Sequence, residues 1–237
     1  MNVIEEFIWR VAKLEDLESR LSILSVIHDF DEKFTSLSER LELFSDTCSS
    51  ITDSRLLRQL MLTIRDIGNI MNEGSSRGDA VGFSVSSLNM LSNIRGVNGV
   101  SLLSYVADVA LHQGIRPGAL LRELPQLHEA VRLPSFAELI VEVQGALLQV
   151  SFSKHSLVNS PRIQEFVRKI NQRVEEMSRL LQRARECYSF VKEYFLDGSL
   201  EQESATNELF ESLNTYCIRM ETCLREQHSS SRRYSMG

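Results

Sequence analysis

The most informative part of this sequence reads Gly68-Asn69-Ile70-Met71-Asn72-Glu73-Gly74 and, two serines later, Arg77-Gly78-Asp79-Ala80-Val81-Gly82-Phe83. The residues before it show the three-and-four spacing of apolar side chains that is typical of a helix. From residue 74 to residue 82, three of nine positions are glycine, and each glycine inside a helix costs about 1 kcal/mol relative to alanine. The stretch therefore predicts the end of a helix followed by a shaped loop.

Two features of this helix end are typical of a contact with another stretch of chain. Gly68 has no side-chain bulk, so another element can approach the helix closely there. Asn69 and Asn72 are three residues apart, so their amides share a helix face and can bond to a non-helical chain. Phe83 would anchor the return of the loop. The pattern alone fits a docking site and a well-packed helix end with a capped loop equally well.

Helical periodicity continues on both sides, and no alternating strand pattern is present. Upstream, the expected helices cover 3–14, 14–27, a third that begins at a capping box formed by Asp29 and Glu32, and 53–72. The third carries an apolar stripe made of Phe30, Phe34, Leu37, Leu41, Phe44, Cys48 and Ile51. Downstream, helices are expected over 86–92, 100–113, 117–131, 134–158, 161–196 and 203–226.

The helix expected over 161–196 has a coiled-coil pattern, because its three-and-four spacing persists for over four heptads. Its apolar series is Ile163, Phe166, Ile170, Val174, Met177, Leu181, Ala184, Tyr188, Val191 and Phe195. The polar, basic end of the chain, 229–237, is expected to be a disordered tail.

Composition is that of a soluble globular protein, with 43% hydrophobic and 24% charged residues. The net charge of −6 argues against nucleic-acid binding, and no run approaches the roughly 18 apolar residues of a membrane span. The start of the chain is acidic at Glu5 and Glu6, unlike a secretory signal. We therefore expect a cytoplasmic protein without membrane insertion.

No arrangement of residues in the sequence indicates catalysis. The glycine-rich loop lacks the Gly-Lys-Ser/Thr ending of a phosphate-binding loop, and no metal-binding His or Cys motif occurs. The integrin-ligand interpretation of Arg77-Gly78-Asp79 requires an extracellular protein, which the acidic start disfavours. The cysteines are expected to be buried or half-buried thiols; they are Cys48, Cys187, Cys217 and Cys223. Neither enzyme activity nor a cofactor or metal is expected.

The quoted stretch closely resembles the signature of formin homology-2 domains: Gly-Asn, two residues, Asn, a glycine-rich turn and a closing Gly-Phe. Further matches to that family follow in order at 5–21, 86–88, 101–105 and 121–133. The resemblance covers about residues 3–226, nearly the whole chain. An ordered series of matches at the family's spacing is far more specific than a glycine-rich loop alone.

The resemblance implies an all-α, elongated multi-helix domain with a coiled-coil arm, which is a partial formin homology-2 domain over 1–228. It implies an actin-binding, cytoskeleton-associated module that contributes to filament nucleation and barbed-end elongation. In formins this region, the post, receives the lasso of the other subunit, so the resemblance favours docking and self-association. The residues assigned to that lasso/post site are Gly68, Asn69, Asn72, Gly78, Gly82 and Phe83.

Two departures from the family pattern bear on function. The family's lasso, linker and first part of the knob have no counterpart before Met1, so we expect a monomer or weak dimer. The family often has Lys after Gly-Phe, implicated in actin binding, where this chain has Ser84; Arg77 and Arg95 are candidate substitutes as actin contacts. These departures favour the alternative of a helical protein-interaction scaffold that has lost actin assembly activity.

Overall fold

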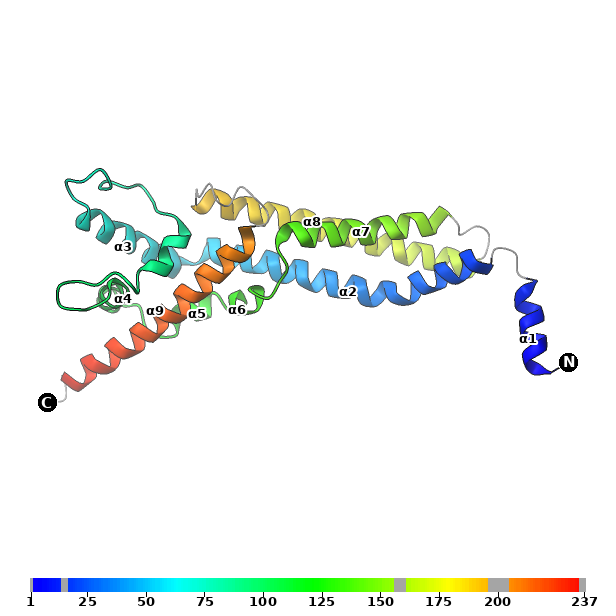
Figure 1. The fold of residues 1–237 in the computed structure, drawn as a ribbon, viewed down its shortest axis with the longest axis horizontal. Helices are drawn as coiled ribbons and strands as arrows, with labels where there is room; N and C mark the ends of the chain where they lie inside the picture. The colour runs from blue at the N-terminus through cyan, green and yellow to red at the C-terminus, as the bar shows by residue number, and fades with distance from the viewer. Residues whose placement is uncertain (1, 14–16, 156–160, 196–204, 235–237) are drawn as a thin grey trace. The chain divides into compact units, whose positions relative to one another are not determined.

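The computed structural model describes residues 2–13, 17–155, 161–195 and 205–234, which are mostly helical (Figure 1). No strand occurs among these residues, where the only pairing of that type is an isolated bridge between Arg95 and Ser101. The all-α prediction is confirmed. The chain divides into two compact units: a first unit of residues 1–41 and 139–182, and a second unit of 42–138 and 183–237.

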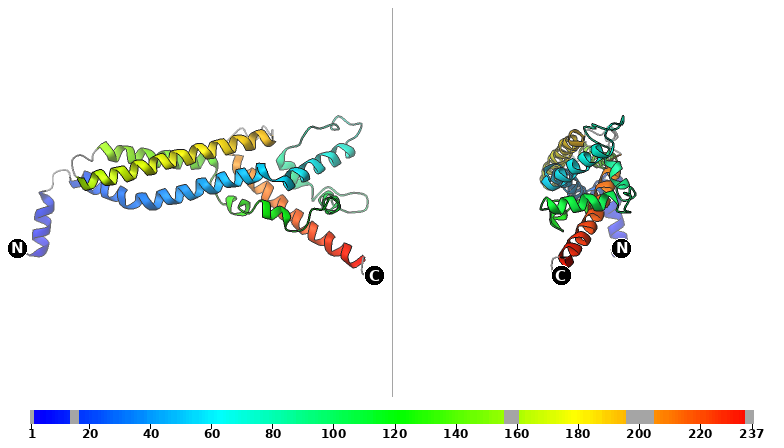
Figure 2. Two further views of the ribbon diagram at one scale, coloured as in Figure 1. Left: turned by 180° about the vertical axis from the view of Figure 1, so that it is seen from behind. Right: turned by 90° about the vertical axis from the view of Figure 1, so that its left-hand side faces the viewer.

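The first unit contains α1 (Val3–Ala12) and portions of α2 (Leu17–Asp53), α7 (Phe136–His155) and α8 (Pro161–Phe195). Within it, the three long helices run side by side (Figure 2). Its buried apolar side chains come from all three and include Phe34, Leu37, Leu139, Val143 and Met177. Arg173 lies over the Phe34 ring at 5.5 Å, and Arg40 forms an ion pair with Glu142. Apolar side chains at three-and-four spacing therefore build this bundle.

One predicted helix start in α2 is wrong. Asp29 and Glu32 do not cap a new helix, because α2 is continuous from Leu17 to Asp53. The apolar stripe from Phe30 to Ile51 is buried at every predicted position. Aspartate is a common helix cap, so Asp29 looked like a helix start in the local sequence. A helix continues through such a residue when its apolar face stays buried.

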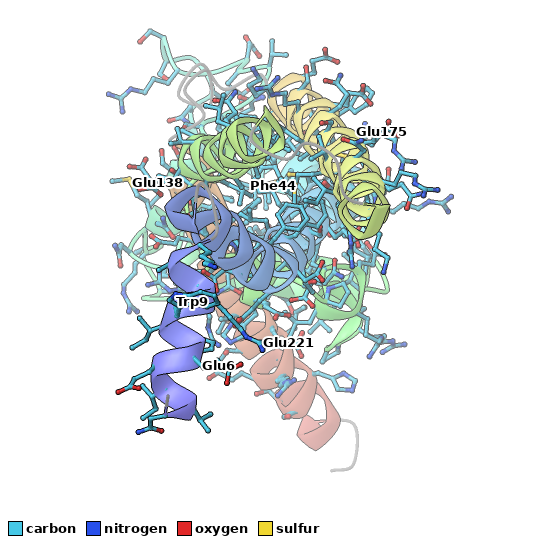
Figure 3. The ribbon with its side chains drawn as sticks, turned by 90° about the vertical axis from the view of Figure 1, so that its right-hand side faces the viewer. Glu6, Trp9, Phe44, Glu138, Glu175 and Glu221 are labelled. Carbon is cyan, nitrogen blue, oxygen red and sulfur yellow. The ribbon has the colours of Figure 1, made fainter. Side chains whose placement is uncertain are left out.

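The second unit contains the remaining portions of α2, α7 and α8. It also contains α3 (Arg55–Met71), the short 3₁₀ helix η1 (Val85–Met90), α4 (Leu102–His112), α5 (Ala119–Glu123), α6 (Leu127–Ala130) and α9 (Thr206–Tyr234). At its core, Phe44 stacks on Phe136 with ring centroids 4.5 Å apart. The rings of Tyr188 and Phe210 also pack against Phe44, with centroid distances of 6.1 and 5.7 Å. Figure 3 labels Phe44 in the interior. Four helices thus converge on one aromatic cluster.

Hydrogen bonds from side chains also connect the loops and helix ends of this unit to its long helices. Glu221 on α9, labelled in Figure 3, is buried and accepts hydrogen bonds from the Gly118 N–H at 2.7 Å and from Arg225 Nε at 2.7 Å. The Thr206 hydroxyl accepts the Phe136 N–H at 3.0 Å. The loop before α5 and the start of α7 are therefore held by buried polar contacts.

Two predicted helices differ from those observed. The segment expected as one helix over 117–131 is split into α5 and α6, because Pro125 between them has no N–H to donate. The last helix, α9, continues through Tyr234, past residue 229 where the tail was expected to begin. The side chains of Ile163 and Phe166 in the coiled-coil series lie outside the described residues.

All four cysteines are free thiols: Cys48 and Cys217 are buried, and Cys187 and Cys223 are half-buried, as predicted. Burial raises the pKa of the Cys217 thiol to about 12, which leaves it unreactive at neutral pH.

Among the helices within the described residues, none combines the length and apolar character needed to cross a bilayer.

We expect Tyr216→Phe to leave the protein as stable or up to about 1 kcal/mol more stable. The Tyr216 hydroxyl is buried and has no hydrogen-bond partner among the described residues, so its removal relieves a desolvation penalty without losing a bond. Urea denaturation followed by circular dichroism measures the change. A loss of more than 1 kcal/mol would show that the hydroxyl is paired in solution.

Candidate functional site

The start of α3 is fixed by polar contacts that include a residue distant in the sequence. The Ser54 hydroxyl accepts the Leu57 N–H at 3.0 Å and so caps the helix. Glu123 on α5 accepts the Ser54 hydroxyl at 2.6 Å and the Leu56 N–H at 3.1 Å. The helix that carries the informative stretch is therefore anchored at its amino end.

The end of α3 is closed by Asn72. Its backbone N–H and its side-chain Nδ2 both donate to the Gly68 carbonyl, at 3.0 and 2.9 Å. Its own carbonyl accepts the N–H and the hydroxyl of Ser75, at 3.0 and 2.7 Å. Asn72 thus bonds within its helix and to the first turn of the loop.

The loop requires glycine at Gly78. A Cβ there would lie 2.8 Å from the Asn72 carbonyl oxygen, which is too close for any side chain. Gly78 also donates its N–H to the Ser75 carbonyl at 3.1 Å. The loop further contains Gly74 at φ +74° and Asp79 at φ 57°, both in the left-handed region. Glycine is therefore required at Gly78 and favoured at Gly74, whereas a Cβ at Gly82 would meet nothing within 4 Å.

Asn69 holds the far side of the loop. Its Nδ2 donates to the Ala80 carbonyl at 3.0 Å, and its Oδ1 accepts the Ala80 N–H at 2.8 Å. The expected bond from an asparagine amide to a non-helical chain is thus present. The non-helical chain in this structure is the protein's own loop.

Gly68 has open space beside it. A Cβ placed on Gly68 would meet nothing within 4 Å, although the residue lies inside α3. No described element of this chain makes the close approach that the sequence predicted there. The lower helix propensity of glycine, about 1 kcal/mol, is therefore not offset by any such contact within the described chain.

A groove of about 690 Å³ runs beside α3. Its lining consists of Arg58, Met61, Leu62 and Arg65 on α3, the segment 81–85, and Glu193, Tyr194 and Phe195 at the end of α8. Because residues three and four apart share a helix face, Gly68, Asn69 and Asn72 continue the stripe of α3 that lines this groove. Gly82, Phe83 and Ser84, predicted as site residues, lie in its wall.

Two arginines give the groove a basic character. Arg58 lies over the Tyr194 ring at 5.6 Å, and its side chain is exposed. Arg65 pairs with its neighbour Asp66 at 2.7 Å. Together with Glu193, the lining carries one more positive than negative side chain, which favours an acidic over a basic partner.

The predicted arginine substitutes for the family's Lys do not line the groove. Arg77 is an exposed residue of the loop, and Arg95 donates to the Gly99 carbonyl at 2.9 Å in the connection after η1. The residues assigned from the sequence as the lasso/post site thus lie together around the end of α3, whereas Arg95 stands apart from the groove lining.

A second cavity of about 310 Å³, which the sequence did not indicate, lies beside α3. Its lining includes Ile67, Ile70, Met71, Ile94, Val100 and Tyr105. Met71 is 58% exposed and its neighbour Ile70 is 73% exposed, although both are apolar residues of α3. The available signal was a pair of apolar residues, Ile70 and Met71, directly before the polar, glycine-rich loop.

Within the described ranges, no group of three or more His, Cys, Asp or Glu side chains is placed to hold a metal ion. The site that the structure brings together is a shaped loop, a groove and an open helix face. Such an arrangement is suited to binding a protein partner.

Comparison with known proteins places these features in a family context. Residues 1–221 match the formin homology 2 domain. Formin-like protein 19 of Arabidopsis thaliana is 31% identical over 145 residues, which cover 60% of this chain and 31% of that protein. Formin-like protein 21b of the same plant is 28% identical over 169 residues, 70% of this chain and 42% of that protein.

Formin-like protein 6 of Oryza sativa subsp. japonica is 29% identical over 168 residues, which cover 70% of this chain and 12% of that protein. The chain therefore spans less than half the length of each of these three relatives.

Proposed function

The chain belongs to the formin homology 2 family, and from this we propose that it is an actin-binding module that contributes to filament nucleation and barbed-end elongation. The observation that carries the proposal is the match of the family's domain to residues 1–221. The proposed partner is actin, and the proposed location is the cytoskeleton. The mechanism is templating: actin subunits held in filament-like geometry lose less entropy when a nucleus forms.

The groove beside α3 is the proposed partner site. Its support is threefold: the open face at Gly68, the loop shaped by Asn69 and Gly78, and the basic lining at Arg58. We propose that a second, lasso-bearing formin subunit and actin dock around this helix end. Glycine destabilises a helix relative to alanine. A partner's backbone that approaches α3 at Gly68 would explain why glycine is present there.

We expect Gly68→Ala to stabilise the folded chain by about 0.5–1 kcal/mol and to weaken partner binding. Alanine is the better helix former, and its methyl group meets nothing within 4 Å in this chain. In a docked complex the same methyl would stand between α3 and the partner. Thermal unfolding and co-sedimentation with actin filaments measure the two effects, and equal binding by both proteins would remove Gly68 from the site.

We expect Ser84→Lys to raise the affinity for actin filaments several-fold. Ser84 lines the groove at the position where the family often has Lys, and an added ammonium group would attract an acidic partner. Co-sedimentation at low and at high salt measures the effect, because the gain should shrink as salt screens the charge. A salt-independent gain, or none, would argue against electrostatic contact at residue 84.

The alternative of a scaffold without actin activity predicts a different result in the same assay. Such a protein stays in the supernatant when actin filaments are pelleted, whatever residue occupies position 84. Ser84 in place of Lys is the observation that favours it.

A further inference from the structure

The first helix, α1, carries an apolar face that the described part of the chain leaves open. None of its residues is buried. Ile4, Phe7 and Ile8 are 64%, 66% and 59% exposed, and Val11 is half-buried. Residues at this three-and-four spacing share one face of a helix. Single exposed apolar residues are common on protein surfaces, but a continuous apolar face marks an interaction site.

α1 has the local contacts of a helix but is short for an independent one. The Asn2 N–H donates to Glu5 Oε2 at 3.0 Å, and Arg10 pairs with Glu6, labelled in Figure 3, at 2.6 Å. The helix has 10 residues, whereas isolated helices shorter than about 12–15 residues are only marginally stable in water. A partner that covers the apolar face would therefore stabilise the helix itself.

The apolar stripe of α1 is symmetric about the midpoint between Phe7 and Ile8. Ile4 lies three residues before Phe7, and Val11 lies three residues after Ile8. Two copies of α1 in antiparallel orientation can therefore place Phe7 opposite Ile8 and Ile4 opposite Val11, so that apolar side chains meet along the whole stripe. This self-complementarity is what an interface with two-fold symmetry requires.

The charges of α1 favour the same orientation. Glu5 and Glu6 lie in its first turn, Arg10 lies in its last turn and Lys13 follows directly. An antiparallel pair places the acidic end of one helix beside the basic end of the other and also opposes the two helix dipoles. A parallel pair would instead place like charges side by side.

We propose that α1 is a self-association site, at which its apolar face packs antiparallel against α1 of a second copy of this chain. The contact uses residues other than those of the groove beside α3 and does not require actin. Because each copy contributes one short helix, the dimer is weak and dissociates on dilution. Such a dimer carries two copies of the groove, which raises the effective concentration of the second once the first has bound.

The test measures the mass of the full chain by sedimentation equilibrium across the micromolar concentration range. Phe7→Ser removes the centre of the stripe. The matched control is Phe190→Ser on α8, because Phe190 is 62% exposed and Phe7 is 66% exposed. We expect the wild type and Phe190→Ser to shift from the 27.0 kDa monomer towards the dimer as concentration rises. Phe7→Ser should raise the dissociation constant at least about tenfold.

Disulfide trapping tests the orientation of the two helices. Ile4→Cys and Val11→Cys place thiols at positions that lie opposite each other in the antiparallel pair. A mild oxidant should cross-link an equimolar mixture of the two variants far more than either variant alone, as seen by electrophoresis without reductant. The wild type, with its native cysteines, gives the background.

Hydrogen exchange provides a separate readout of the same contact. The α1 amides of the wild type should be more protected at high than at low protein concentration, and those of Phe7→Ser should not change. Protection that is the same at all concentrations would mean that α1 packs on its own chain, which overturns the proposal. Circular dichroism melts check that each variant is folded.

Three other results would also overturn the proposal. The wild type could stay monomeric at every concentration. Phe7→Ser and Phe190→Ser could have the same dissociation constant, which would place the association at another surface. Ile4→Cys alone could cross-link as well as the mixture, which would indicate parallel helices.

Discussion

Phe44→Ala is expected to lower the free energy of unfolding by about 3–5 kcal/mol, the range for truncating a fully buried phenylalanine. Phe44 has no exposed surface and contacts three other rings, with Phe136 stacked on it at 4.5 Å. Removing the ring loses its burial and leaves a cavity between helices that come from distant parts of the sequence. Urea denaturation followed by circular dichroism measures the loss.

The matched control for this prediction is Phe190→Ala on α8. Phe190 lies two residues from Tyr188 of the same cluster but is 62% exposed, so its truncation should change stability by less than about 0.5 kcal/mol. Equal losses for the two variants would contradict the placement of the core around Phe44.

Gly78→Ala is expected to disrupt the loop and to reduce actin binding at least tenfold. The added Cβ would lie 2.8 Å from the Asn72 carbonyl oxygen, so the turn must open and shift the segment that lines the groove. The strain is of the order of 1–3 kcal/mol, and it falls on an exposed loop rather than on the core. Global stability should therefore change less than binding does. Co-sedimentation with actin filaments measures the binding.

Gly82→Ala is the steric control, because it adds the same methyl group four residues on, where space is open. Binding by Gly78→Ala that matches Gly82→Ala would contradict the requirement for a shaped loop. Proteolysis offers an independent check, since an opened loop between α3 and η1 should be cleaved faster than the wild-type loop.

The helices and their buried faces could be predicted because each depends on a local pattern. The stripe of α2 from Phe30 to Ile51 is buried at every position that spacing indicated. The errors arose where local signals compete. Asp29 has the chemistry of a helix cap but lies inside a continuous helix. The apolar spacing over 117–131 predicts one helix, but Pro125 divides it into two.

The shaped loop after α3 could be predicted from the sequence, but its contacts could not. The sequence predicted that the Asn69 amide bonds to a non-helical chain and that a shaped loop follows the helix, and both features are present. That the Asn69 amide would meet Ala80 of its own loop depends on how the chain folds back, which spacing does not encode. The groove also needs Tyr194, more than a hundred residues away from the loop. Long-range packing of this kind follows only from the three-dimensional arrangement.

A pyrene-actin assembly assay tests directly whether this chain is an actin-assembly module. It compares this chain with the same chain extended at its amino end by a formin lasso and knob. We expect the extended protein to accelerate assembly and Gly78→Ala in the extended protein to abolish the acceleration. If neither protein changes assembly or barbed-end growth, the chain is not an actin-assembly module and the scaffold alternative is correct.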